Sequence, residues 1–244
     1  MTNPLISKLE RFTRLSSDER VTLDALASRK LRRIRSREHL IHEGDRLTCV
    51  NLIVVGWAHS YKVLADGRRQ IVAFLLPGDL CDPHGYILNE SDHSIAAVTP
   101  LTVAQLSPEE FEALNSPRLV QALRWDALVT SAIQREWTVN IGQRSALERT
   151  AHLILELFHR LESIGPINAK GYDFPIRQTE MADALGMTAV HTNRMLQILR
   201  KEHLIDLGDK HLAIPDLAAL ECLAMFNPNY LHLQHEGHHL DAKD

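Results

Sequence analysis

The chain has 244 residues, of which 45% are hydrophobic and 24% are charged, and its formal net charge is −4. This length suffices for two modest domains or one large one, and the composition excludes a wholly disordered chain. The net charge excludes a protein that is basic throughout, but it leaves room for a local basic face of the kind that contacts nucleic acid.

The sequence has no pattern typical of export, membrane insertion or disulfide cross-linking. Its start, MTNPLISKLERF, has no basic segment leading into an apolar run, and no run elsewhere approaches the length of a bilayer span. We therefore expect a cytoplasmic protein with no membrane partner. Cys49, Cys81 and Cys222 are far apart, which predicts neither a disulfide framework nor a CxxC metal site. Three thiolates are also too few for a four-cysteine iron–sulfur cluster, so that cofactor is disfavoured.

The first half of the chain is expected to be rich in β-strands after a short helix. Ser16 and Glu19 have the order of a capping box, which predicts a helix over about residues 17–28. Between residues 31 and 106, short runs of Val, Ile, Leu and Thr alternate with glycines, and ADGRR at 65–69 is a hairpin signal. This pattern favours an antiparallel sandwich or barrel.

The middle of the chain is expected to be helical. Ser107 followed by Pro108 predicts a helix start, and a long helical pattern follows from about residue 117 to 161. Its apolar residues recur at three- and four-residue steps and form one stripe: Trp125, Leu128, Val129, Ala132, Ile133, Trp137 and Ile141. We expect this stripe to lie along a symmetry mate, because one small domain is too small to bury it. The alternative is a long helix in the core of its own chain. Gly142 is expected to break the pattern into two helices.

The last third of the chain predicts a helix-turn-helix. A loop is expected after Ser163–Pro166, and a short hairpin is expected around Leu207–Lys210. Gly186 fits the turn between two helices, where a left-handed conformation favours glycine. The inward faces are expected to be Met181, Ala184 and Leu185 in the first helix, and Thr192, Met195, Leu196 and Leu199 in the second.

The opposite face of the second helix predicts a DNA-reading surface. Valine can contact a thymine methyl, arginine can bind guanine and asparagine can bind adenine in the major groove. The base-reading candidates are Val190, His191, Asn193 and Arg194, and the candidates for phosphate contact are Arg177, Gln178, Thr179, Thr188 and Lys201. The competing interpretation is an ordinary helical hairpin in a core, which does not explain an exposed valine beside asparagine and arginine.

Three motifs together resemble the cyclic-AMP receptor protein / fumarate–nitrate reduction regulator (CRP/FNR) family of bacterial transcription regulators. They are IHEGD at 41–45, LPGDL at 76–80 and RQTEMADALGMTAVHTNRMLQILRKEHLI at 177–205. The resemblance implies an α+β chain: an antiparallel β-roll sensor over 1–116, a dimerisation helix and hinge over 117–160, and a winged helix-turn-helix over 161–244. It also implies a homodimer on palindromic double-stranded promoter DNA, with RNA polymerase as a further partner, and no enzyme activity.

The chain departs from the family pattern at the effector site and in the recognition helix. Cyclic-nucleotide binders of the family have a glutamate for the ribose and an Arg-Ser/Thr pair for the phosphate, where this chain has Pro83 and His93-Ser94. A histidine that is neutral near pH 7 would not replace the arginine, so cyclic AMP is disfavoured. In the recognition helix Val190 stands where the family often has an acidic residue, while Arg194 is retained.

Cysteine and histidine side chains in the effector segment leave the signal open. Cys81, His84, His93 and Ser94 lie where the family places its effector. The first three could ligate haem or a metal in a gas or redox sensor, or the segment could bind another small ligand or form an interdomain contact. The tail holds His232, His235, His238 and His239, of which His235 and His239 could bind Zn²⁺ or Ni²⁺ weakly. A polar, frayed terminus is the preferred interpretation of the tail.

Overall fold

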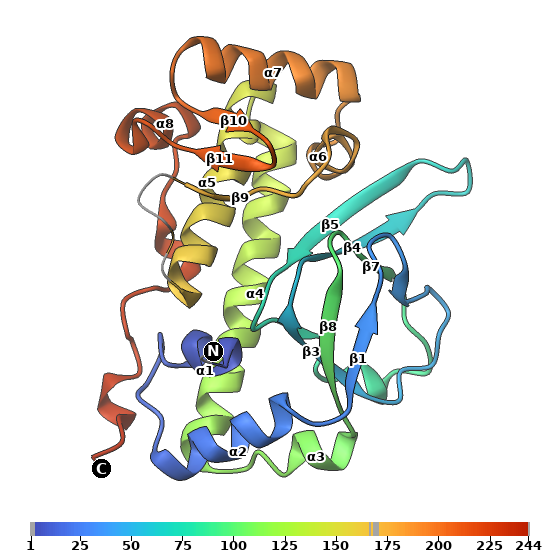
Figure 1. Cartoon of the computed structure of the whole chain (residues 1–244), viewed down its shortest axis with the longest axis vertical. Helices are drawn as coiled ribbons and strands as arrows, with labels where there is room; N and C mark the ends of the chain where they lie inside the picture. Colours follow the sequence, from blue (N-terminus) through green and yellow to red (C-terminus); the bar gives the residue numbers. More distant parts are fainter. Residues whose placement is uncertain (1–2, 166, 168–170, 244) are drawn as a thin grey trace. The chain divides into compact units, whose positions relative to one another are not determined.

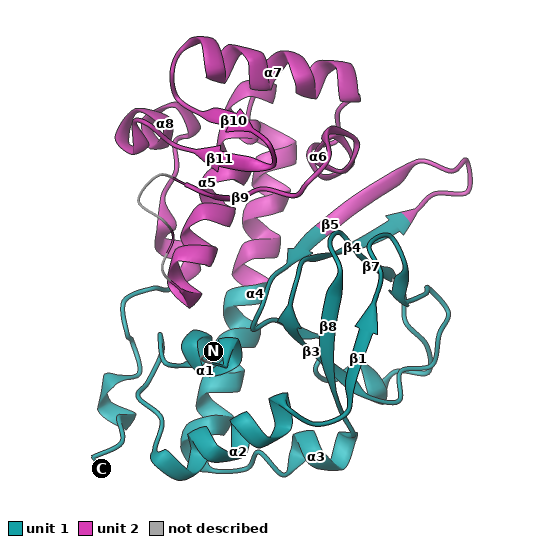
Figure 2. Ribbon diagram, viewed as in Figure 1, with its two compact units in different colours: residues 1–62, 73–130, 232–244 teal, residues 63–72, 131–231 magenta. Residues whose placement is uncertain are grey.

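The computed structural model describes residues 3–165, 167 and 171–243, and its chain forms two compact units (Figure 2). Unit 1 contains residues 1–62, 73–130 and 232–244, and unit 2 contains residues 63–72 and 131–231. The boundary between the units thus lies within the long helical region. The C-terminal tail belongs to unit 1, like the first part of the chain. The expected loop after Ser163 runs into Pro166, which lies outside the described residues.

Two four-stranded sheets, with strand orders β1-β8-β3-β6 and β2-β7-β4-β5, lie mainly in unit 1, while residues 63–72 of the β4–β5 hairpin belong to unit 2 (Figure 1). The strands are β1 (Leu31–Ile34), β2 (His39–Ile41), β3 (Val50–Val55), β4 (Ala58–Val63), β5 (Arg69–Leu75), β6 (Leu80–Cys81), β7 (Ser94–Ala97) and β8 (Leu101–Leu106). Adjacent strands such as β1 and β8 or β4 and β7 run antiparallel. The expected antiparallel architecture is confirmed, and the Asp66-Gly67 turn joins β4 to β5 through a hydrogen bond from Leu64 N to Arg68 O.

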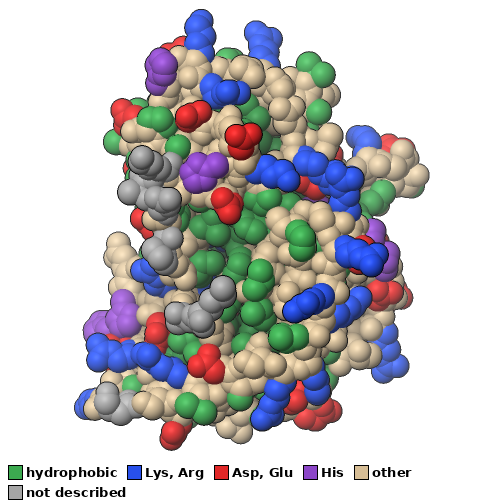
Figure 3. Space-filling view, in the orientation of Figure 1, with side chains coloured by type: hydrophobic (Ala, Val, Ile, Leu, Met, Phe, Trp, Pro, Cys, Tyr) green, Lys and Arg blue, Asp and Glu red, His purple; other side chains and the backbone are tan. Residues whose placement is uncertain are grey.

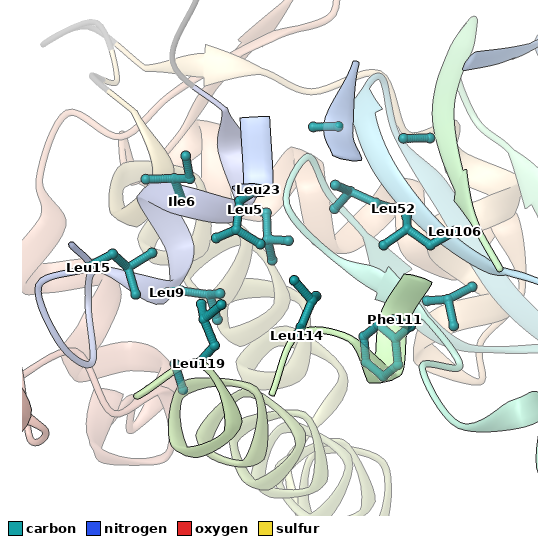
Figure 4. Packing of buried hydrophobic residues seen from close by; sticks show 14 residues of the cluster. Leu5, Ile6, Leu9, Leu15, Leu23, Leu52, Leu106, Phe111, Leu114 and Leu119 are labelled. Carbon is teal, nitrogen blue, oxygen red and sulfur yellow. The ribbon is translucent and has the colours of Figure 1, made fainter. Parts of the chain in front are cut away.

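Short helices close one side of unit 1 and contribute to its core. They are α1 (Pro4–Leu9), α2 (Ser17–Ala27), α3 (Pro108–Glu112) and the 3₁₀ turn η1 (Gly85–Ile87). Ser16 and Ser107 cap α2 and α3 through complete capping boxes, as the sequence predicts. Leucines of α1 and α2 pack with residues of β3, β8 and α3, among them Leu9, Leu23, Leu52, Leu106 and Phe111 (Figure 4).

A lysine between two aspartates lies inside unit 1. Lys8 Nζ in α1 is 2.7 Å from Asp79 Oδ1 and 2.5 Å from Asp126 Oδ1. Burial alone would lower the pKa of Lys8, but the charges of Asp126 and Asp79 outweigh it and raise that pKa to about 12. Lys8 therefore stays charged, and it joins α1, the turn before β6 and the helix that contains Asp126.

The long helical region consists of α4 (Pro117–Gln143) and α5 (Ala146–Ile164). The predicted division into two helices is confirmed, and the break follows Gln143 instead of falling at Gly142. Ser145 is the N-cap of α5: its hydroxyl oxygen accepts from Glu148 N, and its own N–H donates to Glu148 Oε2 across 2.8 Å. This capping box fixes the start of α5, whereas Gly142 stays helical with nothing within 4 Å of the position of a Cβ.

Most of the apolar stripe on α4 is buried within the chain, so the expectation that a symmetry mate covers it is wrong for these residues. Its buried members are Trp125, Val129, Ala132, Ile133 and Trp137. Trp137 Nε1 also donates to the buried carboxylate of Glu156 in α5 across 3.0 Å. Leu128 is 67% exposed and Ile141 is 39% exposed, so these two members of the stripe do face away from the core.

The C-terminal part of unit 2 is a helix-turn-helix followed by a small sheet. Its elements are β9 (Tyr172–Asp173), α6 (Gln178–Leu185), α7 (Ala189–Lys201), β10 (Asp206–Gly208), β11 (His211–Ala213), α8 (Leu217–Ala224) and the 3₁₀ turn η2 (Pro228–Leu231). The sheet order is β10-β11-β9, and the expected hairpin near Leu207–Lys210 is confirmed as β10 and β11. A helix-turn-helix with an adjoining β-hairpin is a winged helix.

The C-terminal tail packs on the N-terminal segment of unit 1, so the predicted frayed terminus is wrong. Gly237 N donates to Phe12 O across 2.8 Å, and Asp241 Oδ1 accepts from Arg14 N across 2.6 Å. Arg118 Nε donates to the carbonyl of Leu240, which ends the 3₁₀ turn η3 (His238–Leu240). The backbone of the tail thus has partners that a frayed end would lack.

Two of the four histidines of the tail have carboxylate partners. His232 Nδ1 is 2.8 Å from Glu236 Oε1, and His235 Nε2 is 2.9 Å from Asp241 Oδ1. Within residues 3–165, 167 and 171–243 there is no group of three histidine, cysteine or acidic side chains that could hold a metal ion. Nor does any helix in those ranges have the length and apolar character needed to cross a membrane.

Candidate nucleic-acid interface

The turn of the helix-turn-helix is built on Gly186. This residue ends α6 in the left-handed conformation, with φ of +61°, as the sequence predicts. The backbone N–H groups of Gly186 and Met187 both bond to Ala182 O. The expected inward faces are confirmed as buried: Met181, Ala184 and Leu185 in α6, and Thr192, Met195, Leu196 and Leu199 in α7.

The opposite face of α7 presents apolar and hydrogen-bonding groups to solvent. Val190 is 83% exposed, more than any other large hydrophobic side chain in the part of the chain that the structure describes. Arg194 is exposed, and no hydrogen bond or ion pair engages its side chain within the described residues. His191 is exposed as well, and its backbone N–H donates to Thr188 Oγ1, which caps α7. A methyl-bearing surface beside a free guanidinium suits the edges of bases in a major groove.

Basic side chains extend this surface toward the end of α7. Arg200 and Lys201 lie in its last turn and are exposed, and Lys and Arg side chains project around α7 on the face in Figure 3. Thr179 at the start of α6 and Thr188 before α7 are exposed too. Hydroxyl, ammonium and backbone N–H donors around an exposed helix face are the groups that contact phosphates.

Arg177 has a structural partner that sequence reasoning missed. Its Nη2 lies 2.6 Å from Glu180 Oε1, and its backbone N–H donates to Glu180 Oε2 across 2.8 Å. The Glu180 side chain is only 2% exposed, whereas that of Arg177 is 47% exposed. Arg177 therefore neutralises a buried carboxylate as well as facing solvent. The spacing of three residues at a helix start is the signal that could have indicated this pair.

The β4–β5 hairpin also contributes to the surroundings of α6 within unit 2. Arg69 Nη2 lies 2.6 Å from Asp183 Oδ2, and Gln70 Nε2 donates to Ala184 O across 3.1 Å. These partners are separated by 114 residues in the sequence, and no local pattern indicates them.

Comparison with known proteins identifies both halves of the chain. A Crp-like helix-turn-helix domain matches residues 148–223, and a cyclic nucleotide-binding domain matches residues 31–116. The transcriptional activator protein FnrL of Cereibacter sphaeroides is 30% identical over 216 residues, which cover 85% of this chain and 84% of the relative. The chain belongs to the CRP/FNR family.

Further CRP/FNR proteins are similar over most of the chain. The nitrogen fixation regulation protein FixK of Bradyrhizobium diazoefficiens is 28% identical over 211 residues, which cover 83% of this chain and 88% of the relative. The structure of FixK2 from Bradyrhizobium japonicum has a TM-score of 0.70 and 25% identity, covering 80% of this chain and 96% of that one. This CRP/FNR protein is a DNA-binding transcription regulator and not an enzyme.

The effector segment of this CRP/FNR protein does not gather Cys81, His84 and His93 into one ligand group. Cys81 is buried, and burial raises the pKa of its thiol well above the usual value. The exposed ring of His84 packs edge-on against Phe111, with centroids 5.5 Å apart. Ser94 is buried, and its Oγ accepts a hydrogen bond from Glu43 N across 2.9 Å.

His93 is held between two carboxylates, which corrects the expectation that it is neutral near pH 7. Its Nε2 lies 3.1 Å from Asp82 Oδ2, and its Nδ1 lies 2.8 Å from Asp92 Oδ1. The hydrogen bond to Asp82, with the charges of Asp82 and Asp92, raises the pKa of His93 to about 9 although burial lowers it. The segment thus has a cation, but a cyclic phosphate would have to compete with two carboxylates for it, which supports disfavouring cyclic AMP.

Replacing His93 by glutamine is expected to lower the free energy of unfolding in a pH-dependent way. A raised folded-state pKa stabilises the fold fully below the unfolded value of 6.5, and this contribution disappears as the pH rises through about 9. Urea denaturation of the wild type and His93→Gln should therefore differ most at acidic pH and least above pH 9. His84→Gln, at an exposed histidine of the same segment, is the control. If the difference in the free energy of unfolding between the wild type and His93→Gln is the same at acidic pH and above pH 9, the raised pKa of His93 is wrong.

Proposed function

We propose that this CRP/FNR protein is a cytoplasmic transcription activator that binds a palindromic promoter site as a homodimer and acts on RNA polymerase. The observation that carries the proposal is the exposed face of α7, where Val190 and the unengaged Arg194 lie beside Asn193. Relatives that cover most of the chain support it, since they are called a transcriptional activator protein and a nitrogen fixation regulation protein.

Base reading is assigned to α7 residue by residue. Arg194 binds a guanine through two hydrogen bonds, Asn193 binds an adenine, and Val190 contacts a thymine methyl, with His191 at the edge. Val190 in place of an acidic residue removes an acceptor for cytosine, so the half-site differs from one read by an acid and an arginine. The phosphate contacts come from Thr179, Thr188 and Lys201, and from the helix starts that carry Arg177 and Gln178.

The dimer is proposed to use the part of α4 that its own chain leaves uncovered. Leu128, Val139 and Ile141 are exposed on this helix, being 67%, 45% and 39% exposed. Two copies related by a two-fold axis would place two α7 helices on half-sites about one DNA turn apart. The signal is proposed to be a small ligand at the β-roll segment that includes His93, and cyclic AMP is disfavoured there.

The test is to select the preferred DNA site from a random pool with the purified protein, with and without cell extract. The proposal expects enrichment of an inverted repeat, and dependence on extract would show that a signal is required. An absorption spectrum and metal analysis of the same preparation test the haem or metal alternative at Cys81, His84 and His93. If no DNA sequence is enriched with or without extract, the proposed function is wrong.

A further inference from the structure

A hydrogen bond between two amide side chains joins the helices of the helix-turn-helix. Asn193 Nδ2 donates to Gln178 Oε1 across 3.0 Å. Gln178 is the first residue of α6, and Asn193 lies in α7 beside Arg194. The bond therefore runs from the start of one helix to the exposed reading face of the other.

The bond leaves Asn193 with one donor and one acceptor for a base. A carboxamide has two N–H donors and a carbonyl oxygen, and Gln178 engages one of the donors. No other hydrogen bond is present at the Asn193 side chain in the described chain, so one N–H and Oδ1 remain. Adenine presents the matching pair in the major groove, an acceptor at N7 and a donor at N6.

The same bond also couples the orientations of the two amides, because each must present the group that matches the other. Turning the Asn193 amide over would place its Oδ1 against Gln178 Oε1, which are both acceptors. The Gln178 amide could turn over as well, unless its Nε2 is engaged elsewhere, and Nε2 has no partner within the described residues. A DNA phosphate accepts hydrogen bonds and donates none, so a phosphate at Nε2 keeps Oε1 facing Asn193.

We propose that Gln178 is a positioning residue for base reading, which links one phosphate to the orientation of Asn193 and thereby makes Asn193 specific for adenine. The inference rests on the proposed function, because it requires that α7 reads DNA. It changes the role of Gln178, which the sequence alone assigns to phosphate contact only. Since Gln178 acts through Asn193, removing it should affect discrimination at one base pair.

The experiment measures DNA binding by the full chain to its selected site and to all single base-pair variants of it. The base pair read by Asn193 is the one at which Asn193→Ala loses discrimination. At that position, 7-deazaadenine replaces the N7 acceptor by carbon and leaves the Watson–Crick edge intact. It is expected to weaken wild-type binding about tenfold or more and to leave Asn193→Ala unaffected.

Gln178→Met removes the hydrogen-bonding groups at nearly constant side-chain length. It is expected to reduce discrimination at that base pair by about threefold to tenfold and to leave discrimination elsewhere unchanged. In the Asn193→Ala background the same substitution should no longer change discrimination. Gln178→Glu keeps the acceptor, so it should retain discrimination even though its charge weakens binding to all DNA. Thr179→Val, at the next position of α6, is the matched control and should weaken all sites alike.

Three results would overturn the proposal. They are equal weakening of every sequence by Gln178→Met, additive effects of Gln178→Met and Asn193→Ala on discrimination, and full discrimination by Asn193→Ala at every position. The first two leave the proposed function intact, because the wild type still selects its site, and the third would also overturn the assignment of adenine to Asn193. A wild type that selects no site would overturn both. Equal melting temperatures of the variants confirm that the effects arise at the interface.

Discussion

Replacing Arg194 by alanine is expected to weaken binding to the selected operator by about 1–3 kcal/mol, or roughly fivefold to 150-fold. The reason is that Arg194 is exposed on α7 and its guanidinium has no partner within the described residues, so it is free for two hydrogen bonds to a guanine. The loss should concentrate at one base pair of each half-site, and the melting temperature should not change. Titration of labelled operator and of random DNA at fixed salt measures both quantities.

Arg200→Ala is the control for charge, because Arg200 is also exposed on α7 but lies in its last turn, six residues beyond Arg194. It should weaken operator and random DNA by the same factor and reduce the dependence of binding on salt. If Arg194→Ala instead behaves like Arg200→Ala, Arg194 contacts only the DNA backbone. The base-reading role assigned to it would then be wrong.

Replacing Lys8 by methionine is expected to lower the free energy of unfolding of unit 1 by about 3–5 kcal/mol. Lys8 lies between Asp79 and Asp126, whose side chains are only 10% and 7% exposed, so its removal leaves two buried carboxylates facing each other. Urea denaturation at neutral pH measures the loss. The loss should shrink toward acid pH, where protonation of one carboxylate relieves the repulsion.

Lys30→Met is the matched control for this ion pair. Lys30 lies 3.0 Å from Glu110, but its side chain is 58% exposed, so its loss should cost less than about 1 kcal/mol. Adding Asp126→Asn to Lys8→Met should restore part of the stability, because only one buried carboxylate then remains charged. A Lys8→Met protein as stable as Lys30→Met would contradict the role of Lys8 as the counter-charge.

The parts of the fold and site that depend on local pattern could be predicted from the sequence. The buried face of α7 follows from apolar residues at helical spacing, and Gly186 follows from the left-handed turn that it makes. The capping boxes at Ser16 and Ser107 predict two helix starts for the same reason. All of these features involve residues within a few positions of one another.

The features that the sequence did not predict depend on contacts between residues far apart in the chain. The buried position of Trp137 depends on Glu156 in the next helix, and the tail is held by Arg14, which lies 227 residues from Asp241. The charge of His93 depends on Asp82 across a turn, so neutral histidine was the default expectation from the sequence. Gln178 and Asn193 are each polar and exposed in the pattern, and only the crossing of α6 and α7 pairs them.

The docked C-terminal tail gives the chain the topology of a domain insertion. The polypeptide enters the main part of unit 2 within α4, leaves it after Leu231, and then rejoins the unit in which it began. The segment that contains the helix-turn-helix is therefore a loop, because the chain continues into unit 1 at both of its ends. Closing a chain into a loop removes orientations that an open chain could sample. One backbone cut after Leu231 would open this loop, and the chain would then pass between the two units only through the β4–β5 hairpin and α4.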